Sequence, residues 1–151
     1  EFRRVLFRSK ISALNLKHFI STEGKRLNGA AFTIRSKRTG KDFTFKVSQI
    51  PFKGVNYLHI KTETEYLNFR YTGWYRDGEV VRKDKNTGKT NPVTTPAGNA
   101  VAWFLRQLFA GNYAGLDSGL DIFHLGKCLK CGKTLTDSQS IEIGIGPVCR
   151  S

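Results

Sequence analysis

The stretch that decides the fold is "AAFTIRSKRTGKDFTFKVSQI", residues 30–50. Apolar and polar residues alternate on both sides of a glycine-containing segment, with Phe32 and Ile34 before it and Phe45 and Val47 after it. A period of two residues is typical of a strand that buries one face, and two such runs around a short glycine-containing segment are typical of a hairpin. The stretch therefore predicts two antiparallel strands joined by a turn at the glycine.

Further strands are predicted downstream of this hairpin. The segments at 55–63 and 66–75 indicate two more strands, and the segment at 78–84 indicates a fifth, ended by "KNTGKTNP". We expect residues 30–84 to form an antiparallel meander of four or five strands.

A single helix is predicted after the meander, because Thr95 is a suitable N-cap, Pro96 suits the first helical position and Gly111-Asn112 ends the pattern. We expect its apolar stripe, Trp103 included, to pack on the apolar face of the sheet. The stripe consists of Ala100, Val101, Trp103, Phe104, Leu105 and Leu108. The predicted fold class is α+β, with a C-terminal zinc knuckle as described below.

The chain divides into four predicted segments. Residues 1–9, "EFRRVLFRS", are interpreted as a linker artefact, and residues 10–29 are compatible with a short helix or a strand. Residues 30–112 form the sheet and helix, and residues 113–151 form a zinc-binding appendage. No apolar run is long enough for a membrane helix, so we expect no membrane partner and a cytoplasmic location in a bacterial host cell.

The charge of the chain indicates an anionic partner. Lys and Arg number 25 against 12 Asp and Glu, which gives a formal net charge of +13, and the excess is greatest in the first 50 residues. A basic excess of this kind attracts polyanions, most often nucleic acid. The alternative is that the charge only keeps the protein soluble.

All three cysteines lie near the end of the chain. Cys128 and Cys131 form a C-x-x-C pair followed by Gly132, and Cys149 comes 17 residues later. This spacing indicates one structural zinc ion, with His124 as the fourth ligand of a closed tetrahedral site. The alternative is that His124 only forms local hydrogen bonds and the fourth ligand is missing.

Residues 124–149 resemble a zinc-binding family of unknown function, numbered 6011, that is common in phage and plasmid proteins. The resemblance implies zinc and a mobile-element setting but no reaction, and "FTIRSKRTGKDFTFKV" is similar to a β-rich segment often found beside it. The matching positions are His124, Gly126, Cys128, Cys131, Gly132, Leu135, Thr136, Ser140, Gly144, Ile145, Gly146, Pro147 and Cys149.

Basic residues interleaved with aromatics predict a surface for nucleic acid. Phosphates contact Lys and Arg while bases stack on Tyr or Trp, although Tyr71 and Trp74 are also suited to the core between sheet and helix. The candidate residues are Arg35, Lys37, Arg38, Lys41, Lys46, Arg70, Tyr71, Trp74, Tyr75, Arg76, Lys127, Lys130 and Lys133.

The sequence thus predicts a nucleic-acid-binding protein of a phage or plasmid that contacts mainly the backbone of DNA or RNA, with single strands favoured. The alternative is a phage-encoded interaction protein that inhibits a host nucleic-acid-handling or defence complex, with a host protein or ribonucleoprotein complex as its partner. We expect no enzyme activity. A magnesium-dependent nuclease using Glu63, Glu65 and Asp77 is the third hypothesis.

Overall fold

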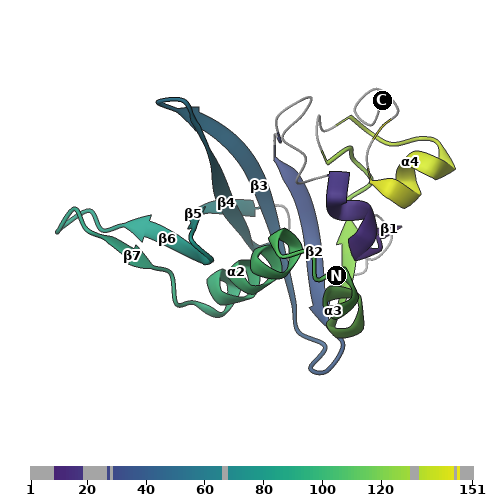
Figure 1. Cartoon of the computed structure of the whole chain (residues 1–151), viewed down its shortest axis with the longest axis horizontal. Helices are drawn as coiled ribbons and strands as arrows, with labels where there is room; N and C mark the ends of the chain where they lie inside the picture. Colours follow the sequence, from purple (N-terminus) through teal and green to yellow (C-terminus); the bar gives the residue numbers. More distant parts are fainter. Residues whose placement is uncertain are drawn as a thin grey trace.

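The structure is a computed structural model that describes residues 9–18, 27, 29–65, 68–129, 133–144 and 146 (Figure 1). The linker interpretation of residues 1–9 falls almost entirely outside the described part. The elements in chain order are β1 (Ser9–Lys10), η1 (Ala13–His18, a 3-10 helix), β2 (Ala30–Ser36), β3 (Asp42–Phe52), β4 (Val55–Glu65), β5 (Asn68–Arg76), β6 (Glu79–Lys83), β7 (Thr90–Pro92), α2 (Pro96–Phe109), α3 (Tyr113–Gly119), β8 (Leu120–His124) and α4 (Ser138–Ile143).

The described strands form one antiparallel sheet in the order β1-β8-β2-β3-β4-β5-β6-β7. Strands β2 to β6 are the five-stranded meander predicted over residues 30–84, but the described sheet is wider than predicted, with eight strands instead of four or five. Three additions explain the difference, and one of them is β1, which pairs with β8 at the edge of the sheet. The predicted end of the meander contains β7, and the predicted link after the helix contains β8, which pairs with β2 on the other side of the hairpin.

The first hairpin is confirmed in its position and in its buried face. Phe32 lies opposite Phe45 in the register of β2 and β3, and Gly40 in the turn has φ 73°, where a glycine is favoured. Thr33, on the other face, is also buried, and its hydroxyl shares a 2.7 Å hydrogen bond with that of Thr44. This bond satisfies two buried polar groups between the strands.

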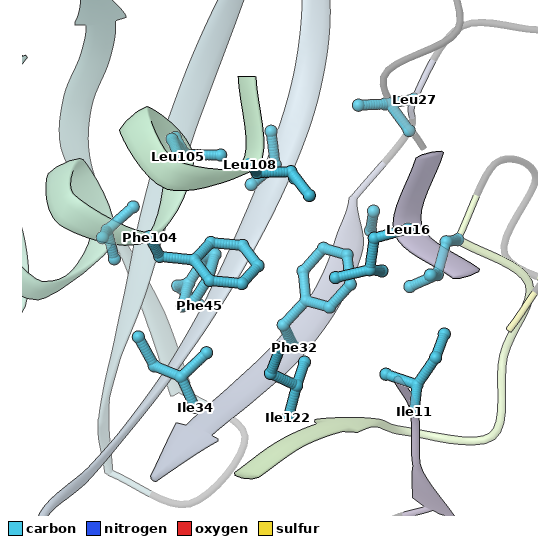
Figure 2. Close-up of a cluster of buried hydrophobic side chains, with 14 of the residues drawn as sticks. Ile11, Leu16, Leu27, Phe32, Ile34, Phe45, Phe104, Leu105, Leu108 and Ile122 are labelled. Carbon is cyan, nitrogen blue, oxygen red and sulfur yellow. The ribbon is translucent and has the colours of Figure 1, made fainter. Parts of the chain in front are cut away.

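The core lies between α2 and the sheet (Figure 2). The rings of Phe32, Phe45 and Phe104 contact one another, with centroids 5.6 to 6.0 Å apart. Leu16 of η1 and Ile122 of β8 belong to the same cluster, so the N-terminal segment and β8 share the core of the meander. Complete burial of each large side chain contributes about 1.5–3 kcal/mol.

Helix α2 begins as predicted, because the Thr95 hydroxyl accepts a 3.1 Å hydrogen bond from the Gly98 amide and Pro96 opens the helix. Trp103, however, is 37% exposed, so the expectation that it belongs to the core was wrong. At 3.6 residues per turn, Trp103 lies about 170° around the helix from the centre of the stripe of buried side chains. Residues Val101 and Leu105 of that stripe are fully buried.

The C-terminal segment packs on the same core. Strand β8 lies between β1 and β2, although residues 113–124 were assigned to the appendage. Cys128, Leu129 and Leu135 are buried members of the core cluster that also contains Ile11. No helix among the described residues is long and apolar enough to cross a membrane.

Candidate nucleic-acid interface and metal site

The sheet has one face that carries α2, α3 and η1, which pack on the Phe32 side (Figure 1). The opposite face is called the helix-free face below. Strand register places on it Lys46 of β3, His59 and Lys61 of β4, and Tyr71 of β5, since these alternate with buried Val47 and Ile60. Thr33 and Thr44 are buried on this face, whereas Lys61 and Tyr71 are exposed and open to contacts other than those of the core.

Aromatic rings and cations alternate across the helix-free face. The Lys46 ammonium lies 4.3 Å from the centre of the Phe69 ring, and the Arg82 guanidinium lies 5.8 Å from that of Tyr71. The ring of His59 is 5.6 Å from that of Tyr71. Tyr71 is 38% exposed, and its exposure rules out the alternative that this side chain fills the core. We call this group the aromatic–cation patch: Lys46, His59, Lys61, Phe69, Tyr71, Trp74 and Arg82.

Two like charges meet at the centre of the patch. Lys46 and Lys61 are direct partners in the register of β3 and β4, and Lys61 in turn lies opposite Tyr71. Like charges directly opposite each other in adjacent strands are destabilising. Neither lysine forms an ion pair among the described residues. A bound polyanion would relieve their repulsion.

Burial determines the charge of the other titratable patch residues. It lowers the pKa of His59, so its imidazole is neutral near pH 7. Burial also raises the pKa of Tyr71, against a smaller opposing effect of Arg82. The positive charge of the patch at neutral pH is therefore carried by Lys46, Lys61 and Arg82.

On the other half of the helix-free face, four described charged residues form two ion pairs. Arg35 lies 3.5 Å from Asp42, and Lys10 lies 3.0 Å from Asp121. The hydrogen bond from Lys10 holds the pKa of Asp121 below its usual range. The cations of this face without a described ion pair thus lie over β3 to β6, where the acidic neighbours include Glu63 opposite Phe69 and Glu79 opposite Arg76.

The structure distributes the predicted contact residues over several places. On the helix-free face lie Arg35, Lys46, Tyr71 and Trp74. Tyr75 instead contacts Phe109 of α2, with ring centroids 5.4 Å apart, and therefore faces the core side. The others lie in the β2–β3 turn (Lys37, Arg38 and Lys41), on exposed positions of β5 (Arg70 and Arg76), in the cysteine segment (Lys127 and Lys133), or outside the described residues (Lys130).

Four patch residues were absent from the predicted set: His59, Lys61, Phe69 and Arg82. The alternation of β4 contains the signal for two of them, because assigning Ile60 to the core places His59 and Lys61 on the opposite face. Phe69 and Arg82 enter the patch through the contacts of their side chains with Lys46 and Tyr71, which strand alternation does not predict.

Antiparallel pairing joins the described residues on either side of the C-x-x-C pair. Lys127 bridges Thr134, the Cys128 amide donates to the Lys133 carbonyl at 2.8 Å, and the chain between them contains Cys131. The buried Cys128 sulfur accepts a 3.3 Å hydrogen bond from the Gly146 amide. Amides directed at a cysteine sulfur stabilise a thiolate, which is the form that binds zinc.

His124 is held by two hydrogen bonds. Its Nδ1 accepts from the Gly126 amide at 2.9 Å, and its Nε2 lies 2.5 Å from the Ile141 carbonyl, to which it donates. Burial lowers the pKa of His124, against a smaller opposing effect of the bond to Ile141. Ligation of zinc through His124 would require one of these bonds to open.

No group of three or more His, Cys, Asp or Glu side chains that could hold a metal occurs within the described ranges. Cys131 and Cys149 lie outside those ranges, so zinc binding stays a prediction. Cys131 is three residues from Cys128, and Cys149 is three residues from Gly146, so chain length allows both sulfurs to approach that of Cys128.

Residues 120–151 match the family of unknown function DUF6011. The resemblance seen at residues 124–149 is therefore confirmed, and the matched segment begins with β8. No curated protein and no solved structure is significantly similar to the chain. The DUF6011 match does not assign a function.

The acidic residues of the nuclease hypothesis do not meet. Glu63 and Glu65 lie at the end of β4 that pairs with the start of β5, near Phe69 and Asn68. Asp77 follows the other end of β5, in the turn to β6. A nine-residue strand spans about 30 Å, so these three carboxylates are too far apart to share one magnesium ion.

Proposed function

We propose that this chain binds single-stranded nucleic acid on the aromatic–cation patch. The observation that carries the proposal is the direct opposition of Lys46 and Lys61 beside the rings of Phe69 and Tyr71. Phosphates would neutralise the two lysines, while bases stack on the exposed rings.

A single strand suits this surface better than a duplex does. Bases that are paired inside a duplex cannot stack on side chains of a sheet, whereas unpaired bases can. Tyr71 presents a partly exposed ring, and Trp74 is half-buried beside His59 in the register of β4 and β5. No described helix on this face is positioned to enter a major groove.

The cysteine segment is proposed to hold one structural zinc ion. Cys128, Cys131 and Cys149 would supply three thiolates, and His124 would supply the fourth ligand if its bond to Gly126 or Ile141 opened. The ion would cross-link the segment and would take no part in a reaction. The pairing of Lys127 with Thr134 supports this role, because it brings together the two described ends of the segment that contains the C-x-x-C pair.

Fluorescence anisotropy with labelled single-stranded and double-stranded oligonucleotides over a salt series tests the proposed binding. We expect tighter binding of single strands and a linear fall of log affinity with log salt. The double variant K46A/K61A should reduce the magnitude of that slope by about 1.4, since each phosphate contact to a single strand contributes about 0.7. K85A/K89A, in the exposed β6–β7 turn, is the matched control with the same loss of charge.

Absence of binding, or equal slopes for the two double variants, would contradict this assignment. Retention of partners from a bacterial lysate tests the interaction-protein alternative. Two results together would favour that alternative over the proposed function: the chain binds no purified oligonucleotide, and it retains protein partners after nuclease treatment.

A further inference from the structure

A second surface, on the other side of the sheet, has the features of a small-ligand site. A cleft of about 370 Å³ lies between the β2–β3 turn, the first half of α2 and the start of β8. Its apolar walls include Ile34, Phe43 and Trp103, and Arg38 and Lys41 line it from the turn. This volume is within the range of about 300–1,000 Å³ that is usual for small-molecule sites.

Trp103 presents an exposed indole to this cleft. It is 37% exposed, and its Cη2 atom lies 3.9 Å from the position that a Cβ on Gly119 would occupy. One edge of the ring is therefore supported by the end of α3 while the ring lines the cleft. A flat, partly exposed indole is a suitable surface for stacking a planar aromatic group.

Two cations beside the indole are available to an anion. The neighbouring Lys37 donates to the Asp117 carbonyl at 2.6 Å, but neither Arg38 nor Lys41 forms an ion pair among the described residues. Pro96, the first residue of α2, also lines the cleft, so the positive end of that helix adds to the attraction.

We propose that this cleft binds one nucleotide, with the base stacked on Trp103 and the phosphate contacted by Arg38 and Lys41. Charge and shape favour this occupant, because a planar apolar wall and two unpaired cations within one small volume complement a base that carries a phosphate. An extended acidic peptide would need a longer groove. The inference rests on the proposed function for its class of ligand, but it uses residues separate from the aromatic–cation patch.

Tryptophan fluorescence tests the assignment. The chain has two tryptophans, so a W74F background leaves Trp103 as the reporter. Titration with adenosine 5′-monophosphate should quench the emission of Trp103. Adenosine should bind about tenfold more weakly, since it lacks the charged group, and inorganic phosphate should not quench. R38A/K41A should reduce the affinity for the nucleotide to that for adenosine.

Three outcomes would overturn the proposal: no quenching at millimolar nucleotide, equal affinities for the nucleotide and adenosine, or tighter binding of a short acidic aromatic peptide. The exposed position of Trp103 makes W103A a foldable second variant, and circular dichroism checks its fold. W103A should bind the nucleotide about tenfold more weakly, as measured by calorimetry. K46A/K61A should leave the nucleotide affinity unchanged while weakening oligonucleotide binding, which separates failure of the cleft from failure of the patch.

Discussion

Replacing Lys61 by glutamine should stabilise the free protein while weakening its binding of nucleic acid. Lys61 is the direct cross-strand partner of Lys46. For an assumed separation of about 7 Å, two ammonium groups repel by about 0.6 kcal/mol in water. Screening reduces this repulsion to about 0.5 kcal/mol at 0.01 M salt, about 0.25 kcal/mol at 0.15 M and less than about 0.1 kcal/mol at 1 M.

Urea denaturation of the free protein, K46Q, K61Q and K46Q/K61Q forms a double-mutant cycle for this repulsion. The cycle should give an unfavourable coupling of about 0.5 kcal/mol at low salt that disappears at high salt. Urea is the appropriate denaturant because it adds no ions. The pair K85Q and K89Q, on exposed positions of the β6–β7 turn, controls for loss of net charge.

A coupling that is zero or favourable at low salt would refute the reasoning, as would one that is unchanged by salt. Oligonucleotide affinity is measured on the same four proteins. If K61Q gains stability and keeps its full affinity, the repulsion is present but has no part in binding.

Three further predictions concern the core and the C-terminal segment. Phe104→Ala should lower the free energy of unfolding by about 3–5 kcal/mol, because the ring of Phe104 packs against those of Phe32 and Phe45. The control Leu14→Ala, at an exposed position, should change it by less than about 0.5 kcal/mol. Similar effects of the two variants in urea denaturation would contradict the described core. Gly144→Ala should lower the melting temperature more than Gly88→Ala does. Both glycines have positive φ, but only at Gly144 would an added Cβ lie 2.8 Å from a side-chain atom of the core. Equal decreases in melting temperature would show that the packing around Gly144 relaxes freely. Elemental analysis should find one zinc per chain, and chelation should reduce amide protection in residues 126–144 more than in β2 to β5; absence of zinc would exclude the metal site.

The sequence predicts the strands whose burial alternates and the helix whose ends carry capping residues. The hairpin around Gly40 and the start of α2 at Pro96 follow from such local signals. Strands β7 and β8 are shorter, and β8 pairs with a strand more than 80 residues away. Their short lengths carry little periodicity, so pairing depends on tertiary contacts that local patterns do not report.

The candidate site was predictable only in part for the same reason. Lys46 and Tyr71 are recognisable as surface residues of predicted strands, but their partners Lys61, Phe69 and Arg82 depend on how strands align. The pairing of β4 and β5 also shifts in register after Ile60, so alternation alone would pair the wrong residues of the two strands. Sequence reasoning thus finds the types of residue in the patch, while strand register determines which of them meet.

The position of β8 inside the sheet limits how the matched C-terminal segment can be transplanted. Residues 120–151 begin with a strand that is hydrogen-bonded to β1 on one side and to β2 on the other. Excised alone, this fragment would carry a strand with two open edges, and its buried Cys128 and Leu129 would lack Ile11, which belongs to the same core cluster. A graft of this segment into another protein should therefore include the β2–β3 hairpin. Otherwise the recipient protein must supply strands that pair with both edges of β8.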